Sequence, residues 1–92
     1  MDGHITVKVV GAVNDQGDHS LPVGASVNDA ILAAKGFATM PYPPAGVINI
    51  RSLRQRDRLY YTRRRLDTQR TDLRAVALKD KDFIVIEYDV AD

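Results

Sequence analysis

The two most apolar segments of this chain lie at its opposite ends, at residues 5–13 and 83–88. The first is rich in β-branched residues and places Ile5, Val7 and Val9 on one face, which predicts a strand that runs to about Val10. The second is apolar on both faces over its first four residues, which is typical of a strand in the middle of a sheet. A helix between them must cover one face of the sheet that they form. We therefore expect the first and last strands to lie side by side and parallel.

One helix is predicted between those two segments. Ser26 is a favourable N-cap, because its hydroxyl can accept a hydrogen bond from a free backbone N–H, and Asp29 follows in the position of a capping box. The apolar residues of the helix recur at helical spacing and form one narrow stripe: Val27, Ala30, Ile31 and Ala34. Gly36 can take the left-handed conformation that ends many helices.

The remaining segments predict shorter elements. Strands are predicted at residues 19–23, 47–51 and 59–62. Loops or turns are predicted at residues 14–18, 40–44 and 79–82. Residues 63–75 are polar and indicate no clear element beyond one helical turn around residues 72–74.

This order of elements, with the end strands adjacent, predicts an α+β fold of the β-grasp (ubiquitin-like) type. We expect a mixed sheet of four to five strands with one main helix packed on one face. A chain of 92 residues suits one domain, so the expected domain covers residues 1–92.

The formal net charge of +1 conceals a strong segregation of charge. Residues 51–74 hold nine arginines and three aspartates, a balance of +6, whereas the rest holds four lysines and nine acidic residues, a balance of −5. The planar guanidinium of arginine makes bidentate contacts with carboxylate or phosphate groups, and it loses its hydration more readily than lysine does. The segment therefore predicts a site for an anionic ligand.

Eight residues of this segment are predicted to bind the ligand: Arg51, Arg54, Arg56, Arg58, Tyr60, Arg63, Arg64 and Arg65. Arg54, Arg56 and Arg58 alternate, so in an extended segment they would project from a single face. Tyr60 continues that phase and could stack under a sugar or a base, while Tyr61 would point the other way. The alternative interpretation is a solvated hairpin whose arginines pair with the acidic remainder of the domain.

Catalytic and metal chemistry has little support in the sequence. Asp18, His19 and Ser20 are the residue types of a catalytic triad, but neighbours on a strand point to opposite faces and cannot converge on one nucleophile. The two histidines, His4 and His19, lack the spacing and the third partner of a metal site, and the chain has no cysteine. We therefore expect a protein that is not an enzyme and that carries no metal and no cofactor.

Several turn, cap and core motifs point to one family. They are Val-Val-Gly-Ala-Val at residues 9–13, the run from Leu-Pro into the helix at 21–31, Ala-Lys-Gly at 34–36, Val-Ile-Asn-Ile-Arg at 47–51 and the turn and strand at 78–85. Over roughly residues 5–88 the chain resembles the soluble-ligand-binding β-grasp (SLBB) domains of bacterial polysaccharide-export proteins. It departs from their pattern at Phe37 and Lys81, which stand where the family usually has glycine.

The resemblance implies a module of polysaccharide export or capsule synthesis that binds an anionic polysaccharide or a neighbouring protein subunit. It also implies a periplasmic or exported location if the chain is cut from a longer precursor, whereas a complete chain would be cytoplasmic. No stretch approaches 18 consecutive apolar residues, so we predict no membrane span.

Two other functions remain open. Interleaved arginine and tyrosine also suit phosphates and stacked bases, which makes nucleic-acid binding the second hypothesis. A purely structural domain that forms homo-oligomers through a strand edge is the third.

Overall fold

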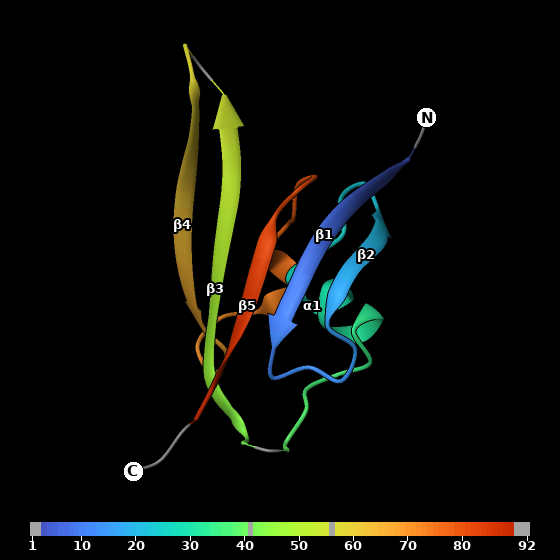
Figure 1. Cartoon of the computed structure of the whole chain (residues 1–92), viewed down its shortest axis with the longest axis vertical. Coiled ribbons are helices and arrows are strands. Elements are labelled where there is room, and N and C mark those ends of the chain that lie inside the picture. The colour runs from blue at the N-terminus through green and yellow to red at the C-terminus, as the bar shows by residue number, and fades with distance from the viewer. Residues whose placement is uncertain (1–2, 41, 56, 90–92) are drawn as a thin grey trace.

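The computed structural model describes residues 3–40, 42–55 and 57–89 of the chain (Figure 1). They form an α+β fold, with a mixed sheet of five strands and an α-helix. In chain order the elements are β1 (His4–Gly11), β2 (Gly17–Pro22), α1 (Val27–Ala33), β3 (Pro44–Gln55), β4 (Leu59–Asp67), the 3-10 turn η1 (Leu73–Ala75) and β5 (Phe83–Tyr88). Across the sheet the strands lie in the order β2–β1–β5–β3–β4.

The strands from the two ends of the chain pair with each other. β1 and β5 run parallel, with Val9 beside Ile84 and Val10 beside Val85. β5 also pairs with β3 on its other side, so it occupies the middle of the sheet. The parallel terminal pair and the central position of the last strand are therefore both confirmed.

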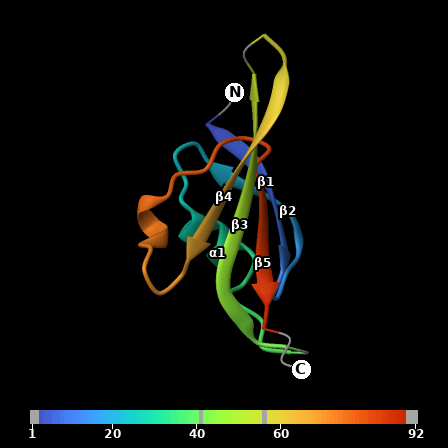
Figure 2. The same cartoon turned by 90° about the vertical axis from the view of Figure 1, so that its left-hand side faces the viewer.

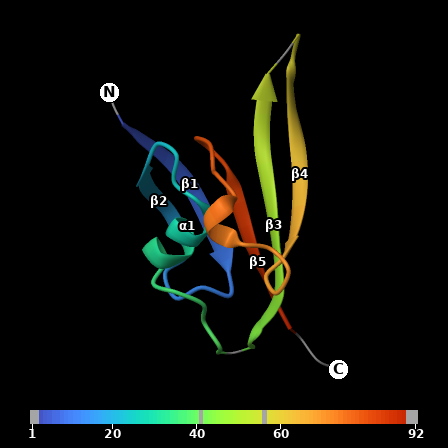
Figure 3. The same ribbon diagram turned by 180° about the vertical axis from the view of Figure 1, so that it is seen from behind.

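The helix begins where the sequence predicts it. The Ser26 hydroxyl accepts a hydrogen bond from the Asp29 N–H, and the Asp29 carboxylate accepts one from the Ser26 N–H at 2.8 Å, which completes a capping box. All four residues of the predicted apolar stripe are buried. α1 packs on β1 and β2 and against η1, so helix and turn lie on the same side of the sheet (Figures 2 and 3). None of the described helical segments has the length and apolar character needed to cross a membrane.

The opposite side of the sheet carries no second layer in the residues that the structure describes (Figure 2). We call this side the open face. In β5, Ile84 and Ile86 are buried on the side of the sheet that carries the helix, whereas the alternating Phe83, Val85 and Glu87 belong to the open face. α1 and η1 lie on one side of the five-stranded sheet, and α1 packs over β1 and β2. In the described residues, the other side is left to solvent or to a ligand.

β3 and β4 form a long hairpin that extends beyond the other strands (Figure 1). The strands predicted at residues 47–51 and 59–62 are both too short, because β3 begins at Pro44 and β4 continues to Asp67. The polar residues 63–65 still join the ladder, since backbone hydrogen bonds to β3 do not depend on side-chain polarity and an edge strand tolerates charged residues. The helical turn predicted around residues 72–74 corresponds to η1.

The turn before β5 has a backbone typical of glycine although it holds Lys81. The φ angle of Lys81 is 69°, in the left-handed region. Its N–H donates to the Thr6 carbonyl at 2.7 Å, and the Asp82 carboxylate accepts from the Lys79 N–H at 2.9 Å. These bonds tie the turn to β1 and to itself, which stabilises the unusual φ of the lysine.

Candidate functional site

The β3–β4 ladder divides the predicted ligand-binding residues between the two faces of the hairpin. Ile48 and Ile50 of β3 are buried on the helix side, so even-numbered residues of β3 and their partners on β4 face that side. On the helix side lie Arg54, Tyr60 and Arg64. On the open face lie Arg51, Arg63 and Arg65.

The expected single row of alternating side chains is only partly correct. Arg54 and Tyr60 do share a face, but they do so as cross-strand partners, because the chain reverses between Gln55 and Leu59. Arg58 lies in the bend at the hairpin tip, and Arg56 lies outside the described residues. Tyr61 is on the opposite face from Tyr60, as expected.

Arg51 and Arg63 are direct cross-strand partners on the open face. The N–H of Thr68 donates to the Gly46 carbonyl at 2.9 Å, and bonded and non-bonded pairs alternate along an antiparallel ladder. Counting from that bond, the two arginines form a non-hydrogen-bonded pair, in which Cα atoms lie about 4.5 Å apart. Like charges directly opposite each other destabilise a sheet. The repulsion between the two arginines therefore lowers the stability of the sheet, and packing within the sheet gives no reason for placing them opposite each other.

Carboxylates of the chain do not neutralise this pair in the described residues. The ion pairs there join Arg70 to Asp67, the last residue of β4, at 3.9 Å and Arg74 to Asp72 at 3.4 Å. The guanidinium of Arg51 instead lies 5.7 Å from the centre of the Tyr61 ring, a cation–π contact that orients it. In the described residues, the arginines of the hairpin therefore do not form the ion pairs with the acidic remainder of the domain that the alternative interpretation requires.

A hollow of about 410 Å³ lies beside the two arginines on the open face. Its lining combines apolar, cationic and hydrogen-bonding groups: Asn49, Ile50, Arg51, Arg63, Phe83, Val85 and Glu87. Phe83 pairs with Arg51 across the β3–β5 ladder and is half-buried, so its ring lies next to the charged end of the hollow. At the other end the amide of Asn49 donates a hydrogen bond to Glu87.

Five of the lining residues are not among the predicted site residues: Asn49, Ile50, Phe83, Val85 and Glu87. They lie in the predicted strands 47–51 and 83–88, and of these two strands only Arg51 is among the predicted ligand-binding residues. A signal was present, because residues 83–86 are apolar on both faces while only one helix is available to cover the sheet. The apolar side chains left without cover then belong to a surface that can contact a ligand.

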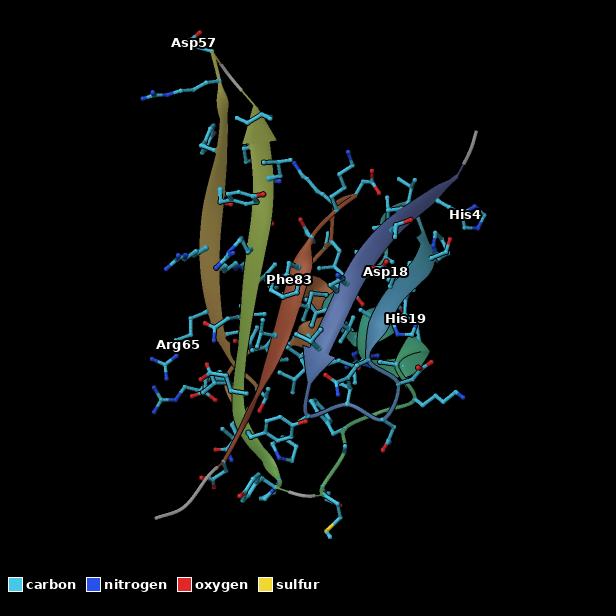
Figure 4. The ribbon with its side chains drawn as sticks, viewed as in Figure 1. His4, Asp18, His19, Asp57, Arg65 and Phe83 are labelled. Carbon is cyan, nitrogen blue, oxygen red and sulfur yellow. The ribbon has the colours of Figure 1, made fainter. Side chains whose placement is uncertain are left out.

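The β1–β2 hairpin holds no competing site in the described residues. His19 pairs with buried Val7, whereas Asp18 and Ser20 pair with Lys8 and Thr6 on the open face, so the three residues do not converge. Figure 4 shows His4, Asp18 and His19 at the β1–β2 edge of the sheet, with Arg65 at the opposite edge and Phe83 between them. Within the described ranges, no group of three metal-ligating side chains is arranged to hold an ion.

Searches against protein-family models and against curated proteins found no match to this chain. The residues of the open face are therefore the basis for inferring a function.

Proposed function

We propose that this chain is a non-enzymatic β-grasp module that binds an anionic polysaccharide on its open face. The strand order, the parallel terminal strands and the single helix on one side support the β-grasp assignment. The resemblance to SLBB domains suggests the same fold and a carbohydrate ligand, with export as the setting.

The observation that carries the proposal is the pair formed by Arg51 and Arg63. Two guanidinium groups project from directly opposite positions on an uncovered face, and within the described residues they have no carboxylate partner. A carboxylate between them would make charge-assisted hydrogen bonds, which are about twice as strong as neutral ones. The ligand would therefore relieve the repulsion that the empty pair imposes.

The rest of the hollow suits a sugar ring. Phe83 and Val85 offer apolar surface to the C–H face of a pyranose, and aromatic side chains are common contacts in such pockets. Asn49 and Glu87 supply a donor and acceptors that match ring hydroxyls. This combination favours a sugar that carries its charge on one carbon and hydroxyls on the others, which describes a uronic acid.

The residues that line the hollow favour binding of a sugar over its hydrolysis. Hydrolysis of a glycosidic bond generally needs two carboxyl groups, about 5–9.5 Å apart on either side of the bond. Among the described lining residues the only carboxylate is Glu87, which is engaged with Asn49. We therefore propose that the bound sugar leaves unchanged.

The proposal predicts that charge on the sugar decides binding. Isothermal titration would compare a hexuronate oligosaccharide with the same oligosaccharide after its carboxyl groups are reduced to alcohols. We expect the acidic form to bind at least about tenfold more tightly, because each charge-assisted hydrogen bond contributes about 1.5–3 kcal/mol.

Equal affinities for the two forms, or no binding of either, would contradict the proposal. A single-stranded oligonucleotide belongs in the same series, since it presents phosphates and stackable bases. An oligonucleotide that bound more tightly than the hexuronate, with an affinity that fell steeply with salt, would favour nucleic acid as the ligand.

A further inference from the structure

β4 lies at the edge of the sheet and presents unpaired backbone to solvent. The alternation counted from the Thr68–Gly46 bond directs the backbone groups of residues 60, 62, 64 and 66 to β3. The N–H and C=O groups of Tyr61, Arg63 and Arg65 then point away from the sheet. In the described part of the chain no other backbone segment bonds to them.

The two edges of the sheet differ in how they are protected. β2, at the other edge, has six residues and ends at Pro22, and a short strand with a proline is a poor template for another chain. β4 has nine residues, contains no proline, and carries Tyr61 with 64% of its surface exposed. Its protection comes from charge alone, in the three consecutive arginines at residues 63–65.

That charge selects the partner. When two copies of β4 pair antiparallel through their middle residues, arginine lies opposite arginine, and like charges at such positions are destabilising. When the added strand is acidic, the repulsion between charges becomes an attraction. The pairing then includes both backbone hydrogen bonds and ion pairs with the arginines. The edge therefore rejects its own copy in that register and favours an extended acidic segment.

We propose that the β4 edge binds an acidic segment of a partner protein by antiparallel strand addition. Acidic residues at alternate positions of the partner would lie directly opposite Arg63 and Arg65 on the open face, within reach of both guanidinium groups. An antiparallel arrangement is the more stable of the two strand directions. Arg63 also lines the hollow, so the two proposals share this side chain. The backbone ladder along the outer edge of β4 needs no carbohydrate, so strand addition can be tested without the carbohydrate proposal.

The test uses a seven-residue peptide that alternates threonine and glutamate, together with two N-methylated forms. In an antiparallel pair, the glutamates opposite Arg63 and Arg65 turn their own N–H groups to β4, while the threonine N–H groups face solvent. Methylation of the glutamate nitrogens should abolish binding, and methylation of the threonine nitrogens should leave the affinity within about threefold. A peptide with glutamine in place of glutamate should bind at least about tenfold more weakly, because it lacks the charge.

Amide hydrogen exchange of the full chain gives a second readout. The bound peptide should slow exchange at Tyr61, Arg63 and Arg65 at least tenfold and leave Thr62 and Arg64, which already bond to β3, nearly unchanged. Equal binding of the two methylated peptides, or uniform exchange along β4, would overturn strand addition. Equal binding of the glutamine peptide would overturn the requirement for an acidic partner.

Discussion

Replacement of Gly11 by alanine is expected to destabilise the fold by about 3 kcal/mol or more, because it combines backbone strain with a steric clash. Gly11 ends β1 with a φ of 99°, a region that L-residues rarely adopt. A Cβ atom at this position would lie 2.0 Å from the carbonyl oxygen of Ile86. That oxygen accepts a hydrogen bond from the Ala12 N–H at 2.9 Å, so it cannot move away without loosening the parallel β1–β5 pair.

Gly24 supplies the matched control for this substitution. Its φ of 90° is similar, but an added Cβ would meet no atom within 4 Å. Gly24→Ala should therefore cost only the backbone strain, about 1–2 kcal/mol. Urea unfolding followed by circular dichroism measures both changes. If the two variants unfolded at the same urea concentration, the steric clash with the Ile86 carbonyl would not contribute to the loss of stability.

Loss of the two opposed arginines is expected to weaken binding of an acidic oligosaccharide about 100-fold. Each guanidinium contributes about one charge-assisted hydrogen bond of 1.5–3 kcal/mol, which corresponds to tenfold or more in affinity. The double variant Arg51→Gln/Arg63→Gln removes both groups and keeps two polar side chains. Its stability should stay within about 1 kcal/mol of the natural chain, because the relief of like-charge repulsion offsets the loss of the Arg51–Tyr61 contact.

The control variant removes the same number of charges from the same two strands. In Arg54→Gln/Arg64→Gln both substitutions lie on the helix side of the hairpin, so the net charge falls equally while the open face keeps its arginines. Isothermal titration should give an affinity within about threefold of the natural chain. If both double variants lost the same affinity, the overall charge of the hairpin would govern binding and the two opposed arginines would have no special role.

The parts of the fold that the sequence predicts depend on local signals that tertiary packing reinforces. The hydroxyl of Ser26 and the carboxylate of Asp29 define the helix start by themselves, and the apolar stripe that follows leaves one orientation for the helix. The apolar run of β5 favours a central place in the sheet, and in the structure β5 lies there, between β1 and β3.

The site was harder to predict because it depends on where the hairpin turns. Pairing with β5 fixes which residues of β3 lie on the open face, and side chains alternate between faces. A shift of one residue in the β3–β4 register would therefore replace Arg63 and Arg65 on the open face by their neighbours in β4. The sequence alone does not show that the chain reverses between Gln55 and Leu59, and the predicted single row from Arg54 to Tyr60 requires an extended segment without this reversal. Phe83 was missed for a different reason, since its exposure depends on how many layers cover the sheet.

The position of the ligand on the open face can be measured directly from the arginine side chains. In the full chain labelled with ¹⁵N-arginine, the Nε–H signals would be followed during titration with the hexuronate oligosaccharide. We predict that the signals of Arg51 and Arg63 shift with saturation, whereas those of Arg54 and Arg64 on the other side of the same strands stay in place. Equal shifts on both sides of the hairpin, or shifts confined to the helix side, would contradict an anion site on the open face.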